Sequence, residues 1–525
     1  MKNKIEKFYV TTPIYYPSGE PHLGHAYCTI AADVIARYKR LLGLDVMFLT
    51  GTDEHGQKIE NKAKASNLTP KEYVDNLSNK FKKLWKILNI SNDKFIRTTD
   101  ESHKRSVQNI FEKLYEQGDI YKGYYKGLYC EPCEAFFTKT QVKDGDLCPD
   151  CGREVKYTEE ASYFFKLSKY SQKILDLYKN NEDFIRPKSC LNEMINFVES
   201  GLDDLCVSRT TFDWGIKVPF DQKHVVYVWL DALTNYITAL GYKNNAGNSL
   251  DFDKYWPADI HIVGKEIMRF HAITWVAILM ALDLKLPKCI FGHGWLLFKD
   301  GTKMSKSKGN VVSPLDLMNR YSVSVDAVRY FLLREFPFGS DGNFGFDTFV
   351  NRVNSDLAND LGNLVSRTVS MIIKYKDGNL NVKSLELTDM EEEVITLIDN
   401  VKISYQKLMD EYKFSESLSK VWEIICWANK YIEKVMPWKL YNEDIIEKLN
   451  TVLYFLCEII RCVNIFIIPF MPETSNKIFK ILNITDENLG NFENLKICIG
   501  ENLNNYIIKG KGDALFPRIL EDDKE

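Results

Sequence analysis

Several features are missing from this 525-residue sequence, and each absence excludes a class of protein. The N-terminus, MKNKIEKFYV, has no apolar segment of the kind that a secretory signal requires. Neither a low-complexity tract nor an internal repeat is evident, so neither disordered nor repeat architectures are expected. The net charge is only −4, which excludes nucleic-acid binding driven by bulk charge but not a local basic face. We therefore expect a globular protein of the cytoplasm.

An uninterrupted apolar run of membrane length is also missing. The most apolar stretch, residues 452–471, is interrupted by Glu458, Arg461 and Asn464. A membrane-spanning helix needs about 20 predominantly apolar residues. We expect this stretch to be a buried helix of a bundle, and we expect no membrane partner.

The twelve cysteines divide into two groups. Eight are scattered singly and are expected to be reduced core residues. The other four form two CxxC pairs with fourteen residues between them: Cys130, Cys133, Cys148 and Cys151. Four thiolates in this spacing are typical of a tetrahedral zinc site. Because four protein ligands close the site, the sequence predicts one structural zinc ion.

Alternating strand and helix patterns occupy two separated parts of the chain. Strands are expected in KFYVTTP and LDVMFLTGT, and the pattern resumes after the cysteine region in HVVYVWLDAL, ADIHIVGK and PKCIFGHGW. An insertion within one parallel sheet explains this order most simply. From about residue 347 onward long amphipathic helices predominate, which indicates an all-α bundle.

Two short motifs indicate phosphate chemistry. PHLGH places His22 and His25 at a strand-to-helix junction, where a helix N-terminus favours anions. Much further along, KMSKSKGN places Lys303, Lys306 and Lys308 in a polar loop of small residues, whose ammonium groups could close on a polyphosphate. Each motif alone also has a structural interpretation: the first could be a pair of surface or capping histidines, and the second a solvated lysine loop.

Together with GTDEHG, VWLDALTNY, VGKEIMRFH, LGNLVSR and VMPW, these motifs resemble the methionyl-tRNA synthetases, class I enzymes that here would carry a single zinc knuckle. The resemblance covers nearly the whole chain. It implies activation of L-methionine by ATP to methionyl-adenylate and pyrophosphate, followed by transfer to the 3′-terminal adenosine of tRNA(Met), including the initiator tRNA. It also implies Mg²⁺ bound with ATP. Because the chain ends soon after LFPRI, without an appended dimerising domain, we expect a monomer.

The resemblance implies a Rossmann-like α/β catalytic domain with an inserted zinc-knuckle domain, followed by an α-helical bundle. The expected segments are residues 1–115 and 223–291 for the two catalytic halves, 116–222 for the inserted connective domain, 292–346 for the KMSKS loop and stem-contact region, and 347–525 for the anticodon-binding domain.

The implied site residues form four groups. The catalytic residues are His22, His25, Lys303 and Lys306. The methionine pocket comprises Ile14, Tyr16, Asp53, Trp229, Ala232, Leu233, Tyr236, Ile267 and His271, with Asp53 paired to the substrate ammonium. ATP is expected to contact His22, Gly24, His25, Gly264, Glu266, Gly294, Leu297 and Lys306. The anticodon is expected to contact Asn363, Arg367 and Trp438.

Other readings of the motifs are less compatible with the sequence. The isoleucine, valine and leucine enzymes of class I carry an editing insertion larger than the roughly one hundred residues available here. The cysteine enzyme uses an active-site zinc, whereas this knuckle is closed by its own thiolates. The remaining alternative is a catalytically silent tRNA-binding relative, against which the intact histidines, lysines and Asp53 argue.

Overall fold

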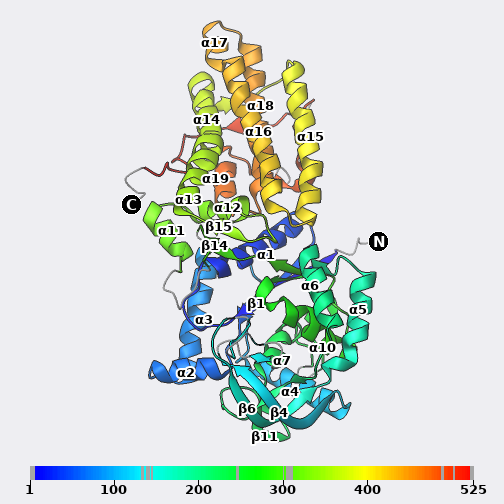
Figure 1. Ribbon diagram of the computed structural model, residues 1–525. Coiled ribbons are helices and arrows are strands. Elements are labelled where there is room, and N and C mark those ends of the chain that lie inside the picture. The colour runs from blue at the N-terminus through cyan, green and yellow to red at the C-terminus, as the bar shows by residue number, and fades with distance from the viewer. Residues whose placement is uncertain are drawn as a thin grey trace. The chain divides into compact units, whose positions relative to one another are not determined.

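The computed structural model describes residues 6–131, 135–137, 142, 146–149, 151–243, 247–299, 301–302, 311–485, 490–500 and 503–520 (Figure 1). The chain divides into two compact units. The first comprises Met1–Pro21 and Asp45–Gly294, and the second comprises His22–Leu44 and Trp295–Glu525. We describe each unit by itself.

A six-stranded parallel sheet forms the centre of the first unit. Its strand order is β3-β2-β1-β12-β13-β7. The strands are β1 (Lys7–Tyr15), β2 (Asp45–Thr52), β3 (Lys94–Arg97), β7 (Ile185–Arg186), β12 (Ile260–Gly264) and β13 (Ile290–His293). Val10 of β1 pairs with Ile260 of β12, so two segments 250 residues apart are neighbours in the sheet. The expectation that the two α/β parts of the chain rejoin in one sheet is confirmed.

Two details of the sheets differ from the sequence interpretation. The segment HVVYV was expected to resume the parallel sheet, but β11 (Asp221–Val226) instead lies in a separate antiparallel sheet between β10 (Lys217–Val218) and β9 (Ser208–Arg209). Conversely, the edge strand β7 comes from the region between the two parts and pairs in parallel with β13. Apolar periodicity indicates that a segment is extended but not which partner it pairs with.

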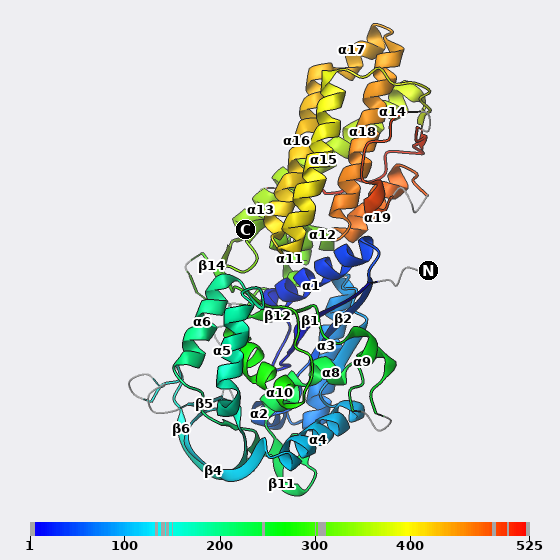
Figure 2. The ribbon, with the colours of Figure 1, turned by 90° about the vertical axis from the view of Figure 1, so that its right-hand side faces the viewer.

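The region that carries the CxxC pairs is built on a long antiparallel hairpin. β4 (Ile120–Cys130) and β6 (Lys156–Phe165) pair along their length, with β5 (Ala135–Phe137) and β8 (Leu205–Cys206) at the edges (Figure 2). The remaining helices of the first unit are α2 (Gln57–Ala65), α3 (Pro70–Ile87), α4 (Glu101–Glu116), η1 (Leu167–Tyr170), α5 (Ser171–Asn180), α6 (Lys188–Glu199), α7 (Val228–Leu233), α8 (Asn235–Thr238), α9 (Leu250–Tyr255), η2 (Lys265–Ile267), η3 (Phe270–Trp275) and α10 (Val276–Ala281).

The second unit is predominantly helical, as expected. Its elements are α1 (Leu23–Leu41), α11 (Pro314–Tyr321), α12 (Val325–Glu335), α13 (Phe346–Arg352), η5 (Val353–Gly362), α14 (Asn363–Lys376), α15 (Asp389–Asp410), α16 (Phe414–Val435), α17 (Pro437–Asn442), α18 (Ile446–Ile467), α19 (Pro472–Ile481) and η7 (Phe492–Asn494), with the short strands β14 (Leu296–Phe298), β15 (Gly342–Phe344), β16 (Asn379–Leu380) and β17 (Tyr506–Ile507). Figures 1 and 2 show α14, α15, α16 and α18 side by side in one bundle.

The most apolar helix, α18, is the centre of this bundle. Within the described part of the chain it is the one helix long and apolar enough to cross a membrane, and 94% of its most apolar window is buried inside the protein. The polar residues that interrupt it have partners inside the protein: Arg461 donates to Glu458 at 2.6 Å, and the side-chain amide of Asn464 donates to the carbonyl of Ser475 at 3.1 Å. The expectation of a buried bundle helix is confirmed.

Candidate functional site

Helix α1 begins with a cap made by two histidine side chains. The Nδ1 atom of His22, the N-cap residue, accepts from the backbone N–H of Gly24 at 3.1 Å. The backbone N–H of His22 donates to Nδ1 of His25 at 3.0 Å. This is the reciprocal arrangement of a capping box, with imidazoles in the places that Ser or Thr and Glu usually occupy.

The cap determines which ring nitrogen carries the proton. Because Nδ1 of both His22 and His25 accepts a hydrogen bond, each neutral ring holds its proton on Nε2. The two ring centroids are only 3.8 Å apart. Gly24 leaves room for this arrangement, because a Cβ atom at this position would lie only 3.0 Å from Cε1 of His22. The start of α1 therefore presents two adjacent N–H donors at the positive end of a helix.

Residues that follow the lysine loop in sequence contact the start of α1. The backbone N–H of Leu23, which is fully buried, donates to the carbonyl of Val312 at 2.9 Å. Lys303 and Lys306 lie outside the described residues. Leu297 lies in β14 and is aligned with Asn343 of β15.

In the first unit, several predicted site residues follow the carboxyl ends of the parallel strands. Tyr16 follows β1, Asp53 follows β2, and Gly294 follows β13. Gly264 ends β12, and a Cβ atom there would lie 2.5 Å from Oε1 of Glu266, so the glycine allows that carboxylate to fold back over the strand end. These strand ends share one edge of the sheet, which is where α/β proteins bind ligands.

The turn that carries Asp53 is fixed at each residue. The backbone N–H of Asp53 donates to the carbonyl of Tyr15 at 3.0 Å. Glu54 is fully buried and receives two hydrogen bonds from Arg97, at 2.7 and 2.9 Å. His55 contacts Asp231 of α7 at 2.6 Å. Asp53 is itself 9% exposed, so a carboxylate is held at the sheet edge on a rigid turn.

Most of the predicted pocket residues belong to one apolar cluster. Leu233 and Tyr236 are core members, and the half-buried residues packed against that core include Ile14, Trp229 and Ile267. Ala232 lies beside Leu233 in α7 and is buried. The indole of Trp229 stacks on Phe270 with ring centroids 3.7 Å apart and planes 5° apart. Sequence analysis missed Phe270, although it directly precedes His271 in the VGKEIMRFH motif.

A neutral polar pair lies within this cluster. Nδ1 of His271 is 2.9 Å from the carbonyl of Ile267, which only accepts, so the proton is on Nδ1. Nε2 therefore accepts from the hydroxyl of Tyr236 at 2.7 Å. Burial lowers the pKa of His271 to about 4, so the ring is uncharged at neutral pH. An apolar wall with one uncharged polar pair suits a thioether better than a charged side chain.

His293, which sequence analysis also missed, lies at the carboxyl end of β13. Burial lowers the pKa of its imidazole, and the charge of Glu266 partly opposes that shift. Its Nδ1–H donates to the carbonyl of Gly294 at 2.8 Å. His293 is thus fixed near Glu266, and the GHGW motif was the sequence signal that could have identified it.

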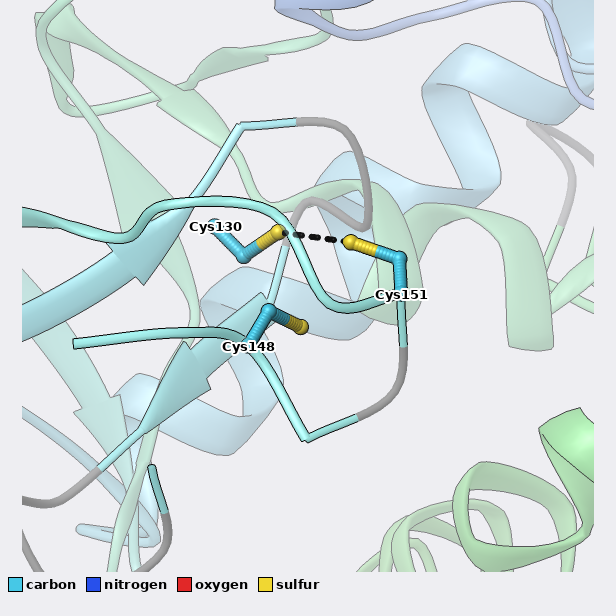
Figure 3. Close-up of side chains that lie close together, drawn as sticks. All are labelled: Cys130, Cys148 and Cys151. Carbon is cyan, nitrogen blue, oxygen red and sulfur yellow. Dashed lines mark hydrogen bonds between the residues drawn. The ribbon is translucent and has the colours of Figure 1, made fainter. Parts of the chain in front are cut away.

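The described cysteines of the two CxxC pairs form a compact cluster. The sulfur atoms of Cys130, Cys148 and Cys151 lie within 4.8 Å of one another and point toward a common centre (Figure 3). Cys133 lies outside the described residues. No disulfide joins any of the eleven cysteines within the described part of the chain, in agreement with the sequence expectation. Of the eight isolated cysteines, Cys426 is exposed rather than buried as expected.

A shallow, open surface pocket of about 500 Å³, called the cavity below, lies between α14 and α16 in the second unit. It is lined by Arg367, Asn429, Lys430, Glu433 and Lys434. Nη2 of Arg367 is 2.6 Å from Oε1 of Glu433. Asn363 is exposed and lies one helical turn before Arg367, on the same face of α14. Trp438 is half-buried and follows Pro437 at the start of α17.

The chain is similar to known proteins over nearly its whole length. Residues 8–369 match the family model "tRNA synthetases class I (M)", and residues 383–525 match the "Anticodon binding domain of methionyl tRNA ligase". A methionine–tRNA ligase of Caldanaerobacter subterraneus subsp. tengcongensis is 56% identical over 98% of this chain and 79% of its own length. That of Bacillus subtilis is 50% identical over 100% of this chain and 80% of its own length.

Solved structures agree with these similarities. A structure of Mycobacterium tuberculosis methionyl-tRNA synthetase in complex with methionyl-adenylate covers 98% of this chain, and this chain covers 100% of it. The two are 41% identical in sequence, with a TM-score of 0.92. The free form of that enzyme gives a TM-score of 0.85 at 39% identity.

Proposed function

The chain belongs to the methionyl-tRNA synthetase family of class I tRNA synthetases, and from this membership we propose which of its side chains perform each step. It is a methionine–tRNA ligase. It activates L-methionine with ATP to methionyl-adenylate and pyrophosphate, and then transfers methionine to the 3′-terminal adenosine of tRNA(Met). Its place of action is the cytoplasm, where tRNA is charged for translation.

His22 and His25 stabilise the triphosphate as the α-phosphorus is attacked. The methionine carboxylate is already ionised at neutral pH, so the attack needs no general base. The catalytic requirement is to bring two anions together and to stabilise the charge that moves toward pyrophosphate. The single observation that carries this assignment is the cap of α1, because it engages Nδ1 of both rings and so leaves the proton of each neutral ring on Nε2, at the positive end of the helix.

Lys303 and Lys306 bind the departing pyrophosphate, with Lys306 the more important. Lys306 precedes Val312 by only six residues, and Val312 is hydrogen-bonded to Leu23 beside both histidines. The covalent chain itself thus limits the distance between the lysine and the imidazoles. Mg²⁺ bound with ATP supplies further neutralisation of the phosphate charge.

Methionine occupies the apolar cluster at the carboxyl edge of the sheet. Trp229, Leu233 and Ile267 contact its side chain, and the Tyr236–His271 pair lies near the thioether. The other predicted pocket residues are Ile14, Tyr16 and Ala232. Asp53 pairs with the substrate ammonium, because it is a carboxylate held at the strand end by the fixed turn of β2. The ATP ribose and adenine contact Gly24, Gly264, Glu266, Gly294 and Leu297.

The function is tested by ATP–pyrophosphate exchange measured with each of the twenty amino acids. We expect methionine to support exchange, and the next best amino acid to be slower by about tenfold or more, because a hydrophobic pocket discriminates one methylene by about 10- to 200-fold. Exchange with no amino acid would favour the silent tRNA-binding alternative. Faster exchange with another amino acid would show that the pocket has been assigned to the wrong substrate.

The cysteine cluster binds one structural zinc ion through Cys130, Cys133, Cys148 and Cys151. Three converging sulfur atoms are a soft ligand set that suits zinc, and the spacing supplies a fourth. Bound zinc would join the ends of the β4–β6 hairpin and would take no part in the reaction.

Elemental analysis of the purified protein is expected to find one zinc per chain, and Cys148→Ser is expected to lose it. Removal of the metal should lower the unfolding temperature of the hairpin region, because ligand-binding free energy contributes to folding free energy. Cys206→Ser, in the same sheet but outside the cluster, is the matched control. Two zinc ions per chain, or none, would contradict the assignment.

The cavity between α14 and α16 receives anticodon bases. Single-stranded bases are recognised by stacking on aromatic side chains and by hydrogen bonds to their edges. Asn363 and Arg367 offer such hydrogen bonds from one face of α14, and Trp438 offers a stacking surface beyond the end of α16. Lys430 and Lys434 add positive charge along the cavity for the RNA backbone.

A further inference from the structure

A buried chain of polar side chains connects four elements of the first unit. The carboxylate of Asp231 in α7 contacts Nδ1 of His55 at 2.6 Å and Nε2 of His103 at 2.7 Å. Nδ1 of His103 is 2.6 Å from Oγ1 of Thr238 in α8. Asp231 is fully buried, and His55, His103 and Thr238 are each at most 5% exposed.

The centre of this hydrogen-bonded chain is the carboxylate of Asp231. Burial alone would raise the pKa of the Asp231 carboxyl, but the charges and hydrogen bonds of His55 and His103 outweigh it and hold that pKa below its ordinary value. The carboxylate therefore accepts from both imidazoles. Nε2 of His103 donates to Asp231, and Nδ1 of His103 is hydrogen-bonded to the hydroxyl of Thr238, whose oxygen also lies 3.4 Å from the carbonyl oxygen of Asn235. Both oxygens of Asp231 are thus used, one for each histidine.

The residues of this hydrogen-bonded chain are close in sequence to residues of the proposed methionine site. His55 lies two residues after Asp53 on the same fixed turn. Asp231 lies between Trp229 and Ala232 in α7, and Thr238 follows Tyr236 by two residues in α8. A one-residue shift of any of these elements would move a substrate-contacting side chain.

Other contacts hold the Asp53 turn in place. Nε1 of Trp214 donates to the carbonyl of Glu54 at 2.6 Å, and Arg97 binds the Glu54 carboxylate. Neither contact reaches α7. The hydrogen bond from His55 to Asp231 links the Asp53 turn directly to α7, the helix that carries pocket residues.

We propose that the buried His55–Asp231–His103 chain is a positioning device for methionine, and that His103, which touches no substrate, sets methionine affinity through Asp231. This inference rests on the proposed methionine site. The reason is that the Asp53 carboxylate and the pocket residues of α7 keep a fixed separation only while both His55 and His103 hold Asp231. Loss of His103 leaves Asp231 held from one side and with one buried oxygen unsatisfied.

The test compares His103→Leu, which removes the donor to Asp231, with His103→Gln, whose amide can replace the Nε2 donor. In methionine-dependent ATP–pyrophosphate exchange, His103→Leu is expected to raise KM for methionine about tenfold. A tenfold change corresponds to about 1.4 kcal/mol, which is the size of one hydrogen bond's contribution. KM for ATP should change by less than about twofold, because the chain lies on the methionine side. His103→Gln should restore KM to within about threefold of the natural protein.

Three further variants separate positioning from folding. Ser106→Ala changes a buried residue one turn further along α4 and should leave both KM values unchanged. Thr238→Val, which removes only the outer hydrogen bond, should raise KM for methionine about threefold and serves if His103→Leu does not fold. Asp53→Asn should raise KM for methionine about tenfold or more, and adding His103→Leu to it should raise KM little further, because both act on one interaction.

The outcomes distinguish the two proposals. An unchanged methionine KM in His103→Leu, an equal rise in both KM values, or a failure of His103→Gln to restore affinity would overturn the positioning role. An unchanged KM in Asp53→Asn would instead overturn the assignment of Asp53 as the ammonium ligand. A lower unfolding temperature with natural KM values would show that His103 is merely structural.

Discussion

Replacing Trp438 with alanine is expected to lower kcat/KM for aminoacylation of tRNA(Met) by about ten- to a hundredfold and to leave ATP–pyrophosphate exchange unchanged. Stacking of a single-stranded base on an aromatic side chain contributes about 1–3 kcal/mol, and about 1.4 kcal/mol corresponds to a factor of ten. Activation requires no tRNA, so a loss confined to the second reaction identifies a tRNA contact.

The surroundings of Trp438 make this substitution interpretable. Pro437 and Leu440 are buried and hold α17 in place, whereas Trp438 is half-buried. Met436, with a φ of 52°, reverses the chain between α16 and α17 independently of the indole. The truncation should therefore remove a surface contact without displacing the helix.

Two control variants accompany this measurement. Trp438→Phe keeps an aromatic face and should retain most of the tRNA affinity. Trp427→Ala removes an indole from α16 that stacks on Tyr431 at a centroid distance of 5.0 Å, and it should not change the KM for tRNA. An equal loss of exchange and aminoacylation in Trp438→Ala would assign the residue a folding role instead.

The sequence was sufficient to predict the elements whose pattern is local. The strands β1, β2, β12 and β13 are apolar segments, and the helices α15 and α16 are long amphipathic segments; all occur where the sequence pattern predicts them. The separation of a parallel sheet from a helical bundle follows from the same patterns. The roles of individual side chains were predicted from the sequence motifs, because apolar periodicity gives no information about them.

What could not be predicted depends on partners far apart in the chain. β7 is two residues long and has no detectable period, so its place at the sheet edge is a consequence of its pairing with β13. The Asp231 chain joins residues 128 and 176 positions apart. A lone histidine in an amphipathic helix, such as His103 in α4, gives no signal of a buried carboxylate so distant in sequence.

The histidine cap of α1 is a third case, because the sequence offered capping only as the alternative to phosphate binding, and the structure shows that both rings cap the helix. The motif indicated that His22 and His25 face phosphate, but not that both rings also close the helix start through Nδ1. This double use has a consequence that can be measured. A residue that caps the helix equally well, but has no second nitrogen, should preserve the fold and abolish the chemistry.

His22→Ser is that substitution, because Ser is among the preferred N-cap residues and accepts from the same backbone N–H groups. The free energy of unfolding should stay within about 1 kcal/mol of that of the natural protein. The rate of exchange should fall by about 10²- to 10³-fold, the loss typical when one donor to a developing anionic charge is removed. KM for methionine should change little, because the ring is assigned to the phosphates.

The central claim is that imidazole N–H groups at the start of α1 stabilise the reacting triphosphate. Its most direct test is the kcat of methionine-dependent ATP–pyrophosphate exchange in His22→Ser. The thermal unfolding of the same variant is measured in parallel. We predict a kcat lower by about two to three orders of magnitude in a protein that unfolds at nearly the natural temperature. Exchange at the natural rate in the folded variant would contradict the account.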